Sequence, residues 1–293
     1  MSLIIKLILR ILLVVVIVAA LAIGAVWGFV YIKFKVNAFS VLGTLNDLNK
    51  PVAVATVAPK AIDYETDMAS AQTSANASIP NIITKDSEGN YTVNDTALPL
   101  MISDMTLSDK QMCAIITTIL KNSDKIDLKF GDIDLKDYDL KLVQFSFSDL
   151  DTTTKTTKFN AVVSISLTKL KNKMTSFPLS LLKGRVPDIV YLSNTVSITK
   201  GTNAWQYTVA SDNLSINDVQ QNKLAEILTI ANNFVTLGTI EELNQKIGTV
   251  LANGIIGNAS NYGFAYALHD AGAQDYDFVL NDEQVKLVIK NLI

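Results

Sequence analysis

Few residues in the chain have the types and spacing that catalysis needs. The single histidine, His269, is followed by Asp270, and such a pair can act as a general base. No Gly-x-Ser-x-Gly turn or other nucleophile accompanies the pair, so we expect a structural role for His269. An interpretation of the chain as an enzyme would depend on His269 and Asp270 alone. The single cysteine, Cys113, lies beside Met112 and Ile116 in an apolar pattern that favours a buried thiol over a redox role. We therefore expect a protein that is not an enzyme.

Metal and cofactor sites have little support in the sequence. One Cys and one His are too few for the common thiolate and histidine metal sites. The four aspartates of one cluster could supply oxygen ligands to calcium, but their spacing is not that of the twelve-residue calcium loop. They alternate with apolar residues, which favours the solvated face of two strands; they are Asp132, Asp134, Asp137 and Asp139. We expect no metal and no cofactor.

The apolar residues of the expected strands say more about a possible function. Their alternating pattern would place a broad set of aromatic and aliphatic side chains on one face of a sheet. Two interpretations stay open: these side chains form an ordinary core, or they line an apolar groove that holds an acyl chain. The candidate groove residues are Phe145, Phe147, Val163, Ile165, Trp205, Tyr207, Tyr262, Phe264 and Tyr266.

A membrane anchor is expected at the N-terminus. The chain has 293 residues and a mean hydropathy of +0.28, which is high for a soluble domain. An uncharged, mostly apolar run from Ile11 to Ile32 is long enough to cross a bilayer as a helix. A cleaved signal peptide is the alternative, but its apolar core would be shorter. We expect a single uncleaved span of the cell membrane, with the N-terminus on the inner side and the bulk of the chain extracytoplasmic.

The charge balance excludes one class of partner. The first 35 residues carry four basic groups and no acidic group, so the remainder has 21 basic and 28 acidic groups and a net charge of −7. Nucleic-acid binding needs a basic field, so no nucleic-acid partner is expected. The expected partners are the lipid bilayer through residues 11–32, a lipid or apolar ligand, and a protein at the cell surface.

The hydrophobic periodicity predicts an α+β fold with long antiparallel strands and few helices. Ser108 and Gln111 form a predicted capping box, as do Thr239 and Glu242. A change of parity before Phe145 predicts a β-bulge. The expected helices cover 109–121, 218–236, 240–254 and 282–292, and strands are expected around 126–130, 138–147, 159–167, 189–198, 205–209, 262–268 and 276–280, with a polar hairpin loop at 148–158.

A five-residue pattern occurs three times, at 107–111, 216–220 and 280–284. Each copy reads as an apolar strand end, a Ser or Asn at the N-cap, an Asp at the first helical position and then, after one residue, a Gln. Any strand-to-helix turn favours such residues, and a true repeat of a sheet-plus-helix unit is the alternative interpretation.

Composition divides the chain into three parts. Residues 1–35 form the tail and anchor, and residues 36–97 are expected to form a stalk and linker. The Ser-, Ala-, Thr- and Asn-rich stretch at 66–97 is typical of a linker or mobile insertion. Residues 98–293 are expected to form the extracytoplasmic domain, which could divide into 98–216 and a smaller unit at 217–293.

The order of these features resembles a known family. An anchor, the turn into an amphipathic helix, long alternating strands, a Phe177-Pro178-Leu179 segment and a Val186-Pro187-Asp188 strand entry are similar to the YpmS-like family of membrane-anchored extracytoplasmic proteins. More distantly, the chain resembles tubular lipid-binding (TULIP-like) domains, in which a long, curled sheet wraps a helix. The resemblance covers roughly residues 98–216 and implies the handling of a lipid or apolar ligand at the cell envelope.

The leading functional hypothesis is therefore a non-enzymatic envelope protein that binds or shields a lipid or other apolar ligand. The alternative is a surface scaffold or assembly subunit that acts through protein–protein contacts.

Overall fold

The computed structural model describes residues 43–44, 46–48, 50, 62–96, 98–122, 129–130, 133–134, 139, 141–166, 168–173, 187–225, 239–261 and 263–291. Within these ranges, no helix combines the length and the apolar character needed to cross a bilayer. The predicted anchor at 11–32 lies outside the described residues, as does the Phe177-Pro178-Leu179 segment.

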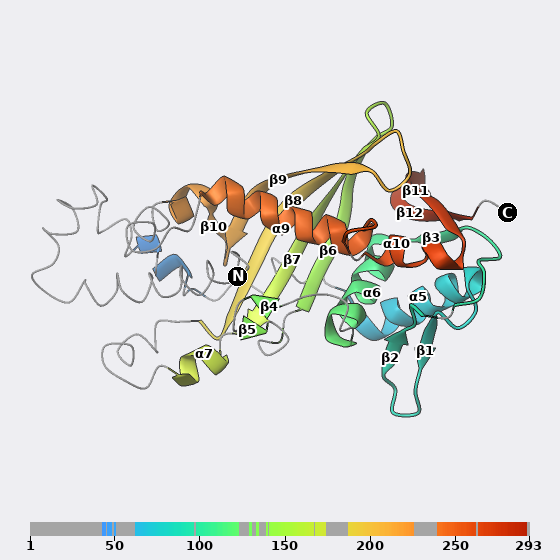
Figure 1. The fold of residues 1–293 in the computed structure, drawn as a ribbon. Helices are drawn as coiled ribbons and strands as arrows, with labels where there is room; N and C mark the ends of the chain where they lie inside the picture. The colour runs from blue at the N-terminus through green and yellow to red at the C-terminus, as the bar shows by residue number, and fades with distance from the viewer. Residues whose placement is uncertain are drawn as a thin grey trace, which may run out of the picture.

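The fold is mixed α+β, with sheets of antiparallel strands packed on helices, as the periodicity predicted (Figure 1). The larger sheet has the strand order β10-β9-β8-β7-β6. Its long strands alternate between buried apolar residues on one face and Ser, Thr and Asn residues on the other, which is typical of an antiparallel sheet with one solvated face. The strands are β6 (Lys141–Asp151), β7 (Thr156–Ser166), β8 (Ile189–Lys200), β9 (Tyr207–Ile216) and β10 (Val219–Gln220).

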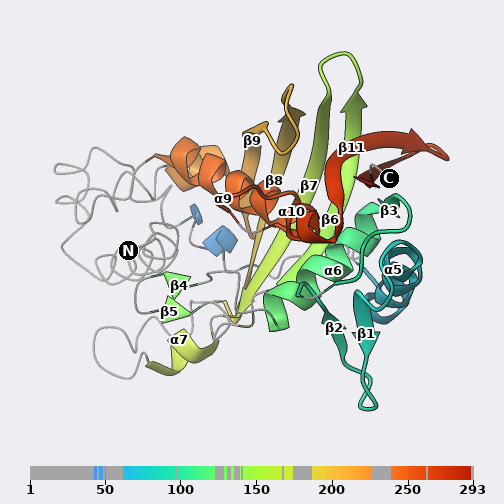
Figure 2. The ribbon, with the colours of Figure 1, turned by 45° about the vertical axis from the view of Figure 1, so that its right-hand side comes forward.

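Two capped helices cover the apolar face of this sheet. Helix α6 (Asp109–Asn122) packs along β6, and α9 (Ile240–Ile255) crosses β8 and β9 (Figure 2). Both predicted capping boxes are present. The Ser108 amide donates to Gln111 Oε1 at 2.8 Å and the Gln111 amide to Ser108 Oγ at 3.3 Å, and the Thr239–Glu242 box is likewise reciprocal. These local hydrogen bonds set the first turn of each helix.

Residues within the predicted linker are folded and buried, so that part of the linker prediction is wrong. Helix α5 (Tyr64–Ser78) packs on α6 through Met68, Ala71 and Ala75, each fully buried. The side chain of Gln111 on α6 donates to two serines of α5, and a short hairpin, β1 (Ile83–Lys85) with β2 (Tyr91–Val93), follows. Small residues permit close helix packing without a strong apolar stripe, which explains why the composition resembled a linker.

The C-terminal region forms a second sheet in place of the predicted helix at 282–292. Strands β11 (Ala273–Asn281) and β12 (Gln284–Asn291) form a hairpin, and β3 (Met105–Leu107) pairs with the other side of β12. In β12, Leu287 and Ile289 are fully buried at a spacing of two. The prediction was wrong because the same segment also has apolar residues at helical spacing, and pairing with β3 and β11 selects the strand.

Two copies of the repeated five-residue pattern are hairpin turns, which overturns the repeat of a sheet-plus-helix unit. Asn217 and Asp218 have φ values of +48° and +62°, and Asp282 and Glu283 have +49° and +62°. Positive φ at both central residues of a two-residue loop is the type I′ turn that matches the twist of hairpin strands. Only the copy at 107–111 begins a helix. The helix predicted at 218–236 is accordingly wrong at its start, where β10 lies; residues 221–225 are helical and 226–236 lie outside the described residues.

One strand prediction and one loop prediction need correction. Within the strand predicted at 262–268, the described residues form the short helix α10 (Phe264–Ala267) instead, because Gly257 and Gly263 bring the chain back against the end of α9. A Cβ on Gly263 would meet the Asn253 carbonyl oxygen at 2.2 Å. The predicted loop at 148–158 is shorter than expected, since β6 and β7 extend to leave only 152–155 as the turn. A register shift between Leu142 and Gln144 confirms the predicted bulge.

The remaining elements are short. They are β4 (Lys129–Phe130), β5 (Ile133–Asp134), α7 (Thr168–Lys173) and the 3₁₀ turn η5 (His269–Ala271). One buried cluster joins α5, α6, the large sheet, α9, α10 and the β11–β12 hairpin.

Candidate functional site

The residues of the predicted apolar groove lie mainly inside the core. Phe145, Ile165 and Phe264 are buried, and Phe147, Val163, Trp205 and Tyr207 are partly buried and packed against the main cluster. Trp205 lies in the β8–β9 connection at φ +65° rather than in a strand, Tyr266 is half-buried on α10, and Tyr262 lies outside the described residues. The described residues of the predicted set are therefore distributed over β6, β7, the start of β9 with the turn before it, and α10.

Most of the aromatic side chains contact one another. Ring centroids lie 4.7 Å apart for Phe145 and Phe159, 5.1 Å for Phe145 and Phe147, and 5.4 Å for Phe147 and Phe278. The series continues through Tyr276 to Trp205, at 5.9 Å and 5.7 Å between successive rings. Edge-to-face and tilted contacts at these distances are typical of packed interiors. This series of rings joins the sheet to the β11–β12 hairpin.

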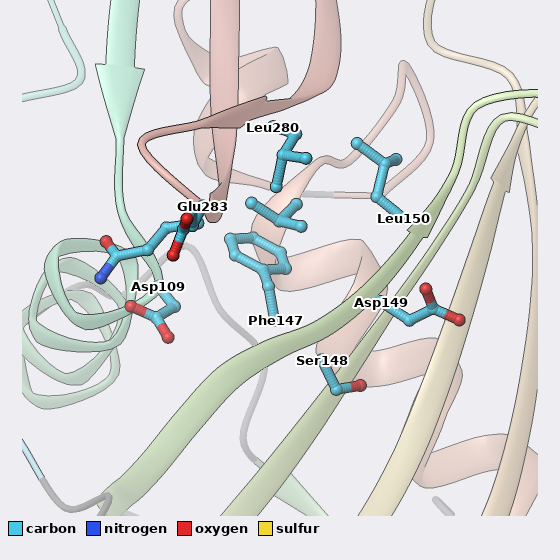
Figure 3. A pocket seen from close by; sticks show the side chains of 9 residues that line it. Asp109, Phe147, Ser148, Asp149, Leu150, Leu280 and Glu283 are labelled. Carbon is cyan, nitrogen blue, oxygen red and sulfur yellow. The ribbon is translucent and has the colours of Figure 1, made fainter.

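Beside the series of rings lies an open pocket of about 340 Å³, which we call the hairpin pocket (Figure 3). Three elements form it: the first residue of α6, the outer half of β6, and the tip of the β11–β12 hairpin. The lining residues are Asp109, Phe147, Ser148, Asp149, Leu150, Leu280, Glu283, Gln284 and Val285.

The hairpin pocket combines apolar side chains with carboxylates. Phe147, Leu150 and Leu280 point toward one another in Figure 3, and Leu280 is 67% exposed. Asp109 and Glu283 lie on one side of this apolar group and Asp149 on the other. The lining residues therefore include three acids and no base.

The carboxylates differ in their local partners. Asp149 lies 3.6 Å from the Lys158 ammonium, whereas neither Asp109 nor Glu283 has an ion-pair partner within 4 Å among the residues that the structure describes. Burial raises the pKa of Asp109, and the amide hydrogen bond from Lys110 opposes this effect. Glu283 adopts a positive φ that favours Gly or Asn, so its side chain is placed at the pocket by a turn that a smaller residue would form more easily.

The residues considered for catalysis lie elsewhere. His269 Nδ1 and Asp270 Oδ1 are 3.6 Å apart on the surface, where the imidazole stacks on Tyr266 at 5.6 Å. Cys113 is buried, as expected, and burial raises the pKa of its thiol. No group of three or more His, Cys, Asp or Glu side chains with the proximity of metal ligands occurs in the described part of the chain; Asp132 and Asp137 lie outside it.

Sequence reasoning found one pocket residue, Phe147, among the site candidates and missed the other eight. The hairpin tip was missed because 282–292 was interpreted as a helix. The available signal was the spacing of two shared by Val285, Leu287 and Ile289 after a polar pair able to form a type I′ turn.

No family model matches the chain, and neither a curated protein nor a solved structure matches it. The resemblance to the YpmS-like family stays a prediction.

Proposed function

We propose that the chain is a single-span protein of the cell envelope that acts without catalysis, through contact between its extracytoplasmic part and another protein at the hairpin pocket. The anchor from Ile11 to Ile32 would hold the folded part of the chain at the outer face of the cell membrane. The observation that carries the proposal is the mixed lining of the pocket: an exposed apolar group between carboxylates. Protein contact sites combine an apolar centre with a polar rim in this way.

A protein contact fits the pocket better than an acyl chain does. Ligand pockets of roughly 300–1,000 Å³ are usually lined by apolar side chains, and burial of a methylene contributes about 0.8 kcal/mol. The hairpin pocket is at the small end of that range, and five of its nine lining residues are polar or charged. Polar groups covered by a hydrocarbon chain would lose hydrogen bonds to water without replacement.

Lipid binding, the leading hypothesis from the sequence, remains a second prediction. For lipid binding, Phe147, the predicted groove residue that lines the pocket, would have to contact the acyl chain, and the curled sheet would have to close round a helix. Native mass spectrometry of the full chain with lipid extraction tests it directly, because a bound lipid adds a defined mass at fixed stoichiometry.

The primary test is photo-crosslinking in intact cells. A benzophenone amino acid replaces Leu280 in the pocket or, as a control, Val250, which is 50% exposed on α9. We expect a discrete protein adduct from position 280 that position 250 does not give. An adduct with lipid alone, or the same protein adducts from both positions, would refute the proposal.

A further inference from the structure

We propose that the hairpin pocket recognises a partner segment in which one apolar side chain is flanked by Lys or Arg. The apolar side chain would enter between Phe147, Leu150 and Leu280, and the cations would meet Glu283 and Asp109 on one side and Asp149 on the other. This inference rests on the proposed function, because it defines the chemistry of the partner at the same site.

The apolar half of the recognition follows from exposure. Leu280 keeps 67% of its surface open to water at the hairpin tip, next to the partly buried Phe147, Leu150 and Val285. A covering apolar side chain would remove these groups from water together. The pocket volume of about 340 Å³ admits a side chain rather than a helix or strand.

The charged half follows from the unbalanced carboxylates. Lys158 faces Asp149, and Lys286 pairs with Asp282 at 3.5 Å, so both lysines already have acidic partners. Lys110 follows Asp109 on α6, and its ammonium acts on the Asp109 carboxyl only through a coulombic interaction, without an ion pair within 4 Å among the described residues. Asp109 and Glu283 lack such a partner among the described residues. A cation from outside would complete both pairs, whereas an anionic segment would meet like charges.

The outer edge of β11, in the sheet of β11, β12 and β3, is blocked, which favours side-chain docking over the addition of a partner strand at that edge. The carboxylates of Asp275 and Asp277 accept hydrogen bonds from the amides of Tyr276 and Phe278, which follow them in β11. The Lys200 ammonium donates to the Tyr276 carbonyl oxygen and pairs with Asp275 at 3.0 Å. Backbone groups occupied in this way are not available to template another strand.

The test uses the full chain in nanodiscs of zwitterionic lipid and three fluorescent peptides, with binding followed by anisotropy. Their central residues are Lys-Leu-Lys, Glu-Leu-Glu or Lys-Ser-Lys in a common Gly-Ser background. We expect the Lys-Leu-Lys peptide to bind at least about tenfold more tightly than either of the others, and to weaken as salt rises. Equal binding of the three peptides would overturn the inference.

Variants locate the binding site. Leu280→Ser should weaken binding of the Lys-Leu-Lys peptide about tenfold, and Glu283→Gln about two- to fivefold. The matched controls, Val250→Ser and Asp212→Asn, remove an exposed apolar group and an exposed charge elsewhere and should leave binding unchanged. Equal losses in the controls would place the binding outside the pocket and overturn the inference.

The two proposals fail separately. A protein adduct at position 280 together with no peptide preference would retain the protein contact and refute the partner chemistry. Selective Lys-Leu-Lys binding that the pocket variants abolish, together with a lipid-only adduct in cells, would retain the chemistry of the pocket and refute the proposed function.

Discussion

The hydroxyl of Tyr276 provides a sharp test of the core. Tyr276 is fully buried in the series of rings, and its hydroxyl oxygen has no hydrogen-bond partner among the described residues. A buried polar group without a partner costs about 1–3 kcal/mol, because it has lost its hydrogen bonds to water. Tyr276→Phe removes the hydroxyl and keeps the ring, which packs at 5.7 Å from Trp205. We expect this variant to be more stable by about 1–2 kcal/mol.

The matched control removes a hydroxyl that has a partner. Tyr207 donates to Asn253 Oδ1 at 2.6 Å, and desolvation raises the pKa of Tyr207 to about 12. Tyr207→Phe should therefore lower the free energy of unfolding by about 1 kcal/mol. Urea unfolding of the full chain in detergent, followed by Trp fluorescence, measures both changes. At an unchanged slope, the midpoints of the two variants should move in opposite directions, each by about 0.5 M.

The result that would refute this reasoning is a loss of stability in Tyr276→Phe similar to that in Tyr207→Phe. Such a loss would mean that the Tyr276 hydroxyl has a partner in the folded protein. A changed slope in either variant would indicate an altered unfolded or native state rather than the loss of one hydroxyl.

Three further predictions address the helices, turns and charges. Gly248→Ala should destabilise the protein by about 1–2 kcal/mol, because its Cβ would lie 2.6 Å from a β9 side chain. The control is Gly254→Ala on the same helix, whose Cβ would meet nothing within 4 Å and which should stabilise the protein by up to about 1 kcal/mol. Thermal melts compare the two variants. Asp218→Gly should raise the melting midpoint by relieving a positive φ in a type I′ turn, with a gain of about 0.5–1 kcal/mol, and an unchanged or lower midpoint would contradict this account. Asp109→Asn should raise the midpoint at pH 7, where the raised pKa of the native carboxyl makes its charge unfavourable. This gain should shrink as the pH falls through the raised native pKa and disappear below about 3, where the acid is protonated in both states, and a constant gain would exclude a charge effect. The charges that face this carboxyl are Lys110 on its own helix, Asp67 on α5 and Glu283 in the hairpin.

The features that the sequence predicted correctly depend on neighbours close in the chain. Each capping box is closed within three residues, as Ser108–Gln111 and Thr239–Glu242 show. The bulge in β6 follows from a local change in the parity of apolar residues. The α+β class followed from long alternating runs, because alternation places one face of each strand against a core whatever its partner.

The tertiary structure decided the features whose determinants are distant in sequence. Residues 284–291 have both strand and helix patterns, and they form β12 because β3, whose paired residues lie at least 180 positions earlier, offers unpaired backbone groups at its side. Helix α5 has little apolar periodicity of its own and is buried because α6 and β3 accept its small residues. Likewise, the sequence by itself determined which strand positions carry aromatic side chains on the apolar face. Only the packing of the β11–β12 hairpin against β6 decided that most of these side chains belong to the core and that Phe147 borders a pocket with Leu280 and Glu283.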